Sequence, residues 1–194
     1  MKSLSELTPS ATRIVDAAEG LIQAVGYNGF SYDDVAQVVG IRKPSIHHHF
    51  PTKAELGAVV VQRYTQRFMN MLAEIVQLEL TLSGRLRSYA RLFETTYAKD
   101  RRLCLCGMLG AESDGLPPNV NQEVRDFFGK NLAWLKSVLQ DGVKKGEIEP
   151  RCSVEVLAKL VLAALEGGML LGRGQESKRG LQQVIEALFS AIGK

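Results

Sequence analysis

The side chains best suited to chemistry in this sequence lie in one short basic segment, residues 42–53. Arg42, Lys43 and Lys53 fall within twelve positions that contain no acidic residue, and a histidine triplet lies between them. Cations and polar donors grouped in this way can face the phosphates and base edges of a nucleic acid. The net charge of the chain is only +3. The local grouping, and not the overall charge, therefore favours a phosphate-facing surface.

The histidine triplet, His47 to His49, raises the alternative of a metal site. Successive residues of a helix point about 100° apart, so three adjacent imidazoles cannot converge on one ion, whereas a pair spaced i, i+4 can. We interpret the histidines as polar residues on a helix surface, and we expect neither a metal ion nor an organic cofactor.

The segment from Arg42 to Phe50 predicts a short helix with one buried face. Proline is acceptable in its first turn at Pro44, and Pro51 ends it. Ile46 and Phe50 are spaced i, i+4 and would form the inner face. The side chains that then point outward are cations and small polar groups: Arg42, Lys43, Ser45, His48 and His49.

Two helices are expected before this segment. Apolar residues recur at helical spacing from Ile14 to Val25, with Thr8 and Pro9 as the start signal and Gly26 as the stop. A capping box at 31–34 begins a second helix, which Gly40 ends. A capped helix, a tight turn and a helix with a polar outer face form the layout of a helix-turn-helix. Spacing alone leaves open the alternative of a solvated face on a small bundle.

The remainder of the chain also reads as helical. A second capping box at 52–55 begins a long helix that we expect to end near Leu82. We find no convincing alternating strand, and the connections are short. The predicted fold is all-α with about nine helices, the later ones covering roughly residues 84–99, 103–115, 118–145, 153–171 and 175–192.

Composition excludes several classes of protein. The chain has 194 residues, of which 45% are apolar, so it can bury a core and is not disordered. Its most apolar window, residues 160–171, is interrupted by Glu166 and is too short to span a membrane. The three cysteines are an odd count without an export signal, which indicates reduced thiols in the cytoplasm. The sequence has no GxSxG, P-loop, HExxH, CxxC or Rossmann motif, so we do not expect an enzyme.

The run from Gly29 to Leu56 resembles the N-terminal DNA-binding domain of the TetR/AcrR family of transcriptional regulators, and the resemblance extends more diffusely over the whole helical plan. It implies a helix-turn-helix domain at 1–52 and a ligand-binding and dimerisation domain at 53–194. It also implies a homodimer that binds a palindromic double-stranded DNA operator, most often as a repressor that a small effector releases. The alternative is a helical small-molecule-binding protein that does not bind DNA.

The resemblance carries DNA-contacting roles to individual residues. The base-facing or groove-facing positions match the outer face of the short helix, and the phosphate-side positions match the starts of the helices on either side. At His47 the family more often has tyrosine, and the shorter imidazole puts that contact in doubt. The full set is Ser31, Tyr32, Arg42, Lys43, Ser45, His47, His48, His49, Thr52 and Lys53.

The stretch from Val154 to Leu171 is apolar nearly all round, so it must be covered on more than one side. Together with the last helix it predicts a four-helix dimer interface. A core helix within a single chain is the alternative. The residues expected at the interface are Leu160, Ala164, Gly167, Gly168, Leu181, Ile185 and Leu188.

The resemblance implies an effector site among the middle helices. Aromatic residues and methionines at helical spacing are often plain core, but together they suit an apolar or aromatic effector. Glu112 and Glu166 lie in apolar surroundings, where each could meet a cationic or hydroxylated ligand or be buried and paired. The expected lining is Phe68, Tyr89, Phe93, Tyr97, Cys104, Met108, Phe127 and Trp134.

The segment around Cys104 and Cys106 resembles the start of the sixth helix in a branch of the family where a cysteine senses electrophiles or oxidants. Arg101 and Arg102, together with a helix N-terminus, would lower the pKa of such a thiol. The alternative is a pair of inert buried cysteines. An electrophilic effector therefore stands beside an apolar or aromatic one.

Overall fold

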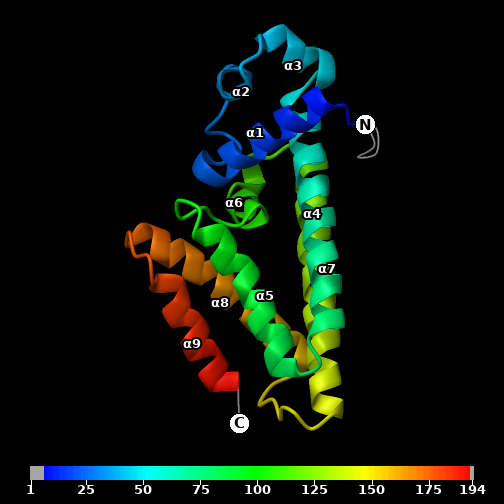
Figure 1. Ribbon diagram of the computed structural model, residues 1–194, viewed down its shortest axis with the longest axis vertical. Helices are drawn as coiled ribbons and strands as arrows, with labels where there is room; N and C mark the ends of the chain where they lie inside the picture. Colours follow the sequence, from blue (N-terminus) through cyan, green and yellow to red (C-terminus); the bar gives the residue numbers. More distant parts are fainter. Residues whose placement is uncertain (1–6, 193–194) are drawn as a thin grey trace. The chain divides into compact units, whose positions relative to one another are not determined.

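The computed structural model describes residues 7–192, which form nine α-helices and no β-strand (Figure 1). The expected all-α fold is confirmed. The chain packs into two compact units that interleave along the sequence. The first contains residues 7–67 and 105–128, and the second contains 68–104 and 129–192. The predicted division at 52/53 follows chain order, whereas packing places residues 105–128 with the N-terminal helices.

The first unit groups the short N-terminal helices with α6 (Figure 1). The long helices α4 and α7 each begin in this unit and end in the other, because the division falls within them. The elements are α1 (Pro9–Val25), α2 (Tyr32–Val39), α3 (Lys43–His49), the start of α4 (Lys53–Leu78), α6 (Leu105–Ala111), a short 3-10 turn (Ser113–Gly115) and the start of α7 (Pro118–Lys144).

Local signals set the ends of α1 and α2 where the sequence predicts them. Thr8 Oγ1 accepts a hydrogen bond from Ala11 N at 3.2 Å, which satisfies one open donor of the first turn. Ser31 and Asp34 form a reciprocal capping box at the start of α2. Gly40 ends α2 with φ 72°, a left-handed conformation that glycine adopts without a steric penalty.

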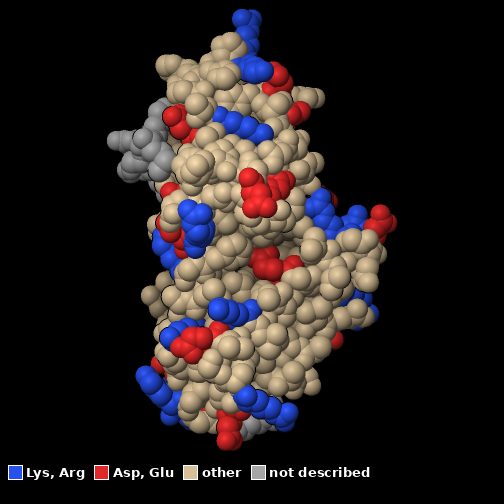
Figure 2. Space-filling view, turned by 180° about the vertical axis from the view of Figure 1, so that it is seen from behind, with Lys and Arg blue, Asp and Glu red and all other residues tan. Residues whose placement is uncertain are grey.

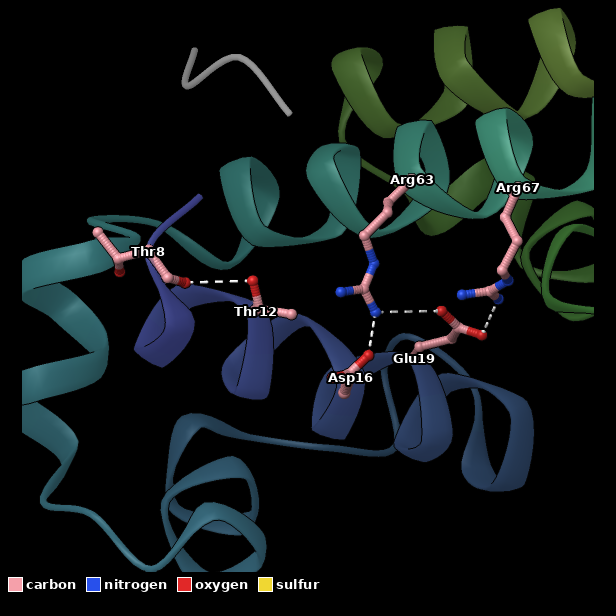
Figure 3. A network of polar contacts seen from close by, with 6 residues as sticks. All are labelled: Thr8, Thr12, Asp16, Glu19, Arg63 and Arg67. Carbon is pink, nitrogen blue, oxygen red and sulfur yellow. Dashed lines mark hydrogen bonds and ion pairs between the residues drawn. The ribbon is translucent and has the colours of Figure 1, made fainter. Parts of the chain in front are cut away.

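Ion pairs join α1 to α4 on the outside of the first unit (Figure 3). Arg63 pairs with Asp16 and lies 3.7 Å from Glu19, and Arg67 Nη2 donates to Glu19 Oε1 at 2.6 Å. On its inner side α1 buries Ile14 and other apolar residues completely. Helix α1 is therefore joined by charge to the middle of α4, and it also packs an apolar side into the first unit.

The second unit is built around a helical hairpin. The final helix, α9, folds back on α8 and packs closely against it (Figure 1). A Cβ atom added at Gly168 would lie 3.0 Å from Leu181 Cδ1, so glycine permits this close approach. The elements are α5 (Leu82–Tyr97), α8 (Val154–Gly174), α9 (Gly180–Ile192) and the later parts of α4 and α7.

Several helix ends differ from the sequence-based expectation, among them the start of α9 at Gly180, and two of the differences have a clear cause. Helix α4 ends at Leu78, and Thr81 Oγ1 accepts from Gly84 N at 3.1 Å to begin α5. Because the Thr81 hydroxyl caps α5, this helix begins at Leu82, two residues before the start that we expected. The expected break at 172–174 lies inside α8. A Cβ atom at Gly172 would lie 2.6 Å from the Tyr97 hydroxyl, so this glycine provides packing space and does not end the helix.

Over residues 7–192, none of the helices combines the length and the apolar character that a bilayer crossing requires.

Candidate DNA-binding and ligand-binding sites

Helix α3 has one buried side and one exposed side. Ile46 and Phe50 are 0% and 2% exposed, as their spacing predicts. The side chains of Arg42, Ser45 and His48 are exposed to solvent. A helix this short is marginal in isolation, so its orientation depends on the residues that pack beneath it.

The turn before α3 is held by backbone and side-chain hydrogen bonds. Gly40 N and Ile41 N both donate to Ala36 O, at 2.9 and 3.1 Å. Arg13 Nη2 reaches from α1 to donate to Val39 O at 2.5 Å. These bonds fix the angle between α2 and α3 and so determine the direction in which the outer face of α3 points.

Tyr32 and His47 stabilise the C-terminal end of α3 by contacts within the chain. The Tyr32 hydroxyl is buried and donates to Phe50 O at 2.9 Å, and burial raises the pKa of Tyr32 well above its ordinary range. The His47 ring packs edge-on against Tyr32 at 4.7 Å, and its Nδ1 lies 3.3 Å from Pro51 O. In this arrangement both side chains brace the helix end, and a phosphate contact by either would require these bonds to be exchanged.

Two of the three lysines and arginines in the basic segment are occupied by protein partners. Lys43 Nζ forms an exposed ion pair with Asp33 at 2.7 Å. Lys53 Nζ donates to Phe30 O at 2.5 Å and lies 4.2 Å from the centre of the Phe30 ring. Desolvation by burial lowers the pKa of Lys53, and the charges of Glu112 and Asp34 partly oppose this shift. The cation that α3 presents most openly is therefore Arg42.

The other predicted DNA-facing residues lie at the helix starts. Ser31 Oγ donates to Asp34 Oδ2 at 2.7 Å, and Thr52 Oγ1 accepts from Glu55 N at 3.2 Å. His49 is partly buried and its ring lies 5.5 Å from that of His48. Figure 2 shows basic side chains, with acidic ones beside them, at the upper tip where α2 and α3 lie. The tip thus carries charges of both signs, and Lys43 and Asp33 form one of the ion pairs there.

Hydrogen bonds join the turn between α1 and α2 to Glu112, which follows α6. Glu112 Oε2 accepts from both Asn28 N at 3.1 Å and Asn28 Nδ2 at 3.2 Å. The Glu112 carboxylate is therefore paired within the first unit. Glu112 is thus paired as in one of the two alternatives, although its hydrogen bonds are exposed and not buried, and it connects the segment after α6 to the N-terminal helices.

The second unit brings four of the predicted ligand-lining aromatics together. Tyr89 is 0% exposed and stacks on Trp134 with ring centres 5.2 Å apart and planes inclined by 23°. Phe93 lies 5.3 Å away edge-on, and Phe68 lies 6.3 Å away. Rings at these separations and angles attract each other beyond their apolar burial.

Polar groups lie within this aromatic cluster. The Tyr89 hydroxyl donates to Asn131 Oδ1 at 2.7 Å, and Asn131 is 0% exposed. Burial raises the pKa of Tyr89, and the nearby Glu166 and Cys104 raise it further. Burial also raises the pKa of Glu166 to about 7, opposed by a hydrogen bond with Cys104. Glu166 thus belongs to the cluster, whereas Glu112 does not.

Asn131 was missed at the level of sequence. The available signal was its position, one helical turn before Trp134 on an otherwise apolar stripe of the same helix. A polar residue at such a position is either solvated or hydrogen-bonded in the core. Only the structure shows which.

Of the remaining predicted ligand-lining residues, Cys104 lies beside this cluster through its hydrogen bond with Glu166, and the other three lie elsewhere. Tyr97 donates to Ser177 O at 2.6 Å, at the α8–α9 turn. Phe127 is buried in the first unit, 5.5 Å from the Tyr64 ring, and Met108 belongs to α6 of the same unit. Cys104 and Cys106 are both buried, and only Cys152 of the three cysteines is exposed.

The predicted dimer residues divide into two groups. Gly168, Leu181, Ile185 and Leu188 are buried in the chain's own α8–α9 hairpin. Leu160 is 52% exposed, and Ala164 and Gly167 are partly exposed. Further exposed apolar residues on α8 are Val156, Leu170 and Leu171.

Three N-terminal helices, of which the third has an exposed polar side and follows a tight turn, form the arrangement of a helix-turn-helix DNA-binding protein. The chain belongs to the TetR family. The model of bacterial regulatory proteins of the tetR family matches residues 14–59, and that of the tetracyclin repressor-like C-terminal domain matches residues 83–188.

Individual relatives agree with this assignment. A TetR-family transcriptional regulator from Agrobacterium tumefaciens is 33% identical, with a TM-score of 0.92 over 95% of this chain and 98% of that one. The transcriptional repressor DhaR of a Mycobacterium species is 22% identical over 95% of this chain and 93% of its own. FadR of Bacillus subtilis, solved in complex with stearoyl-CoA, is 18% identical with a TM-score of 0.74, over 93% and 98% of the two chains.

Proposed function

We propose that this TetR-family protein is a ligand-responsive transcriptional repressor that binds a palindromic operator as a homodimer. The observation that carries the proposal is the exposed polar face of α3, with Arg42 at its start and Ile46 and Phe50 fully packed beneath it. Helix α3 is the second helix of the helix-turn-helix, and a helix held in this way can enter the major groove of DNA. The repressor named among its relatives and the complex of FadR with stearoyl-CoA support both halves of the proposal.

Among the predicted DNA-facing residues, the geometry favours different roles. Arg42, Ser45 and His48 point to solvent and are suited to base edges or phosphates. Lys43 and Lys53 would exchange protein partners for phosphate, whereas Tyr32 and His47 position the helix. Ser31, Thr52 and His49 lie at the helix ends, where backbone amides can meet phosphate. In this scheme sequence is read by few side chains.

The proposed coupling between effector and operator uses the two helices that belong to both units. Helices α4 and α7 pass from the second unit into the first, and Glu112 ties the segment after α6 to Asn28. A ligand that favours one arrangement of these helices would change the orientation of α3, and DNA binding would change the affinity for ligand to the same extent.

Homodimerisation in this proposal uses the exposed side of α8. Leu160, Leu170 and Leu171 are 52%, 62% and 61% exposed, and apolar side chains of this size seldom cluster on the surface of a monomer. The residues of α9 that we predicted at the interface would then pack behind α8 and support this surface.

The proposal also includes a division into two domains. Residues 1–52 would bind DNA, and residues 53–194 would bind the ligand and the partner chain. A cytoplasmic location and the absence of enzymatic activity are further parts of the proposal.

Electrophile sensing is the weaker form of effector response here. Cys104 and Cys106 are 2% and 0% exposed, and thiol reactivity requires both access and the thiolate form. The structure therefore favours a non-covalent effector over one that attacks these thiols.

The test of DNA binding uses duplex DNA from upstream of the protein's own gene. We expect salt-dependent binding to an inverted repeat, and we expect Arg42→Ala to weaken it by about 1–3 kcal/mol if the side chain reads a guanine, or to reduce the salt slope by about one unit if it contacts phosphate. Fluorescence anisotropy at several salt concentrations separates the two roles.

The matched control is Lys130→Ala, which removes one exposed positive charge from α7. It should leave operator affinity unchanged. Equal weakening by both variants would show that only net charge matters, and the absence of any salt-dependent duplex binding would favour the small-molecule-binding protein without DNA affinity.

A further inference from the structure

The cluster around Tyr89 contains polar atoms that no residue of the described chain satisfies. We call Tyr89, Asn131, Trp134 and Glu166 the Tyr89 cluster. Asn131 Nδ2, Trp134 Nε1 and Glu166 Oε1 are all buried from solvent and have no hydrogen-bond partner. A buried donor or acceptor without a partner costs about 1–3 kcal/mol, so native proteins seldom leave one unsatisfied. Three such atoms around one tyrosine are therefore unusual.

The three residues that carry these atoms all lie near Tyr89. Tyr89 bonds to Asn131 at 2.7 Å and stacks on Trp134 at 5.2 Å, and Glu166 is close enough for its charge to act on the phenol. Asn131 and Trp134 are one helical turn apart on α7, so they share a face. Asn131 is 0% exposed, which excludes direct solvation of its amide.

The chemistry of the unsatisfied atoms defines what would complement them. The amide nitrogen of Asn131 and the indole nitrogen of Trp134 can only donate, so they require acceptor oxygens. The Glu166 carboxyl already takes part in a hydrogen bond with Cys104, and its Oε1 atom can accept from a hydroxyl. A molecule that carries both an acceptor oxygen and a hydroxyl group would satisfy all three positions.

The surroundings of the cluster select against charge. Within the described chain, the groups that shift the pKa values of Tyr89 and Glu166 include no lysine, arginine or histidine. An anion would therefore be desolvated beside a carboxyl without a countercharge. A cation could meet Glu166 but would leave the amide and indole donors without acceptors. An uncharged ligand avoids both costs.

The ring contacts select for an aromatic ligand. Phe68 and Phe93 lie 6.3 and 5.3 Å from the Tyr89 ring centre, and Trp134 stacks on Tyr89, so the side chains around the unsatisfied atoms are mostly aromatic. Flat apolar surfaces of this kind favour a second ring over a flexible chain. Building on the proposed ligand response, we infer that the Tyr89 cluster recognises a small uncharged aromatic hydroxy compound through Asn131, Trp134 and Glu166.

Trp134 makes the inference directly measurable, because it is the only tryptophan of the chain. Titration with 4-hydroxybenzyl alcohol should change its fluorescence and raise the melting temperature of the full-length protein. Two comparison probes carry charge: 4-hydroxybenzoate and benzylammonium. The inference predicts that both bind at least about tenfold more weakly than the uncharged alcohol.

Two variants test the contacts. Asn131→Leu removes the amide donors, and Glu166→Met removes the carboxyl while keeping a side chain of similar length. Each should weaken binding about tenfold, the value of one buried hydrogen bond of ordinary strength. Glu166→Met should also raise the melting temperature without ligand, because a desolvated carboxyl is removed. Gln140→Leu, an exposed position of α7, is the control and should bind like the wild type.

If Asn131→Leu fails to fold, Trp134→Phe replaces it, since phenylalanine keeps the stacked ring and loses only the N–H donor. Binding is then followed by thermal shift. No binding of the alcohol at millimolar concentration, tighter binding of either charged probe, or wild-type affinity in both variants would overturn the inference and assign the three atoms to bound water.

Operator binding measured on the same samples separates this inference from the proposed function. If the protein binds the inverted repeat but not the alcohol, the proposed regulatory function stands and the proposed ligand class is wrong. If the protein binds the probe as expected but has no affinity for duplex DNA, the proposed ligand class stands and the proposed repressor function is wrong.

Discussion

At Glu166 burial changes the ordinary behaviour of a carboxyl group. Its pKa is raised to about 7 from 4.5, chiefly by desolvation, while the hydrogen bond with Cys104 acts in the opposite direction. The folded chain therefore holds a proton at this residue over a pH range where the unfolded chain has released it. The neutral form is the one that the aromatic surroundings favour.

This difference predicts how stability depends on pH. Between about pH 4.5 and 7 the folded state binds more protons at Glu166 than the unfolded state, so the free energy of unfolding should fall as pH rises and level off above pH 7. Glu166→Gln should remove this decrease. Urea unfolding at intervals of pH measures it, and an identical pH profile in wild type and variant would contradict it.

At the scale of single elements, the start of α2 shows how local bonds set geometry near the DNA-facing tip. Ser31 N and Ser31 Oγ both donate to Asp34 Oδ2, each at 2.7 Å. The pKa of Asp34 is lowered, mainly by the Ser31 side chain and then by the Ser31 backbone. Because α2 leads directly into the turn before α3, this cap supports the position of α3, the proposed DNA-contacting helix.

Ser31→Ala should destabilise the protein by about 1 kcal/mol, the usual value of a hydroxyl cap. It should also move the Asp34 pKa back toward its ordinary value of 3.8. A carboxyl with a lowered pKa stabilises the fold above its unfolded value and loses that effect as the pH falls through the folded one. The variant should therefore show less loss of stability on acidification below pH 4, in unfolding curves and in the NMR titration of Asp34.

The matched comparison at this scale is Ser31→Thr, which keeps a capping hydroxyl. It should retain most of the stability and the low Asp34 pKa. Equal behaviour of the alanine and threonine variants would show that the backbone donor of Ser31 alone sustains the cap.

At the scale of the whole molecule, the proposed regulation requires two copies of α3 to reach one duplex. Equivalent helices must then lie about 34–36 Å apart, one turn of DNA. The outer side of α8, with Leu160, Leu170 and Leu171 exposed, is the proposed surface of association. A dimer formed there would double the phosphate contacts and so the salt dependence of binding.

Leu160→Glu should convert the dimer to a monomer at micromolar concentration, since it places a charge in an apolar interface. Operator affinity should fall at least about tenfold as the second reading helix is lost. Sedimentation velocity and anisotropy measure the two effects. The control is Leu78→Glu, at an 80% exposed position at the end of α4, and it should leave the dimer intact.

The sequence by itself determined the helical class, most helix starts and the two-sided character of α3. These features depend on signals that act within about four residues, such as the Thr8 cap, the Ser31 capping box and the spacing of Ile46 and Phe50. The family resemblance rested on the same short segment. Such signals need no knowledge of distant contacts.

Tertiary structure alone decided which polar groups are occupied. Glu112 bonds to Asn28, 84 positions away, and Tyr89 bonds to Asn131, 42 positions away. No local pattern encodes these partners, because hydrogen bonding between distant residues depends on how helices pack. For the same reason packing, and not apolar periodicity, buried Leu181 within the chain's own hairpin and left Leu160 exposed.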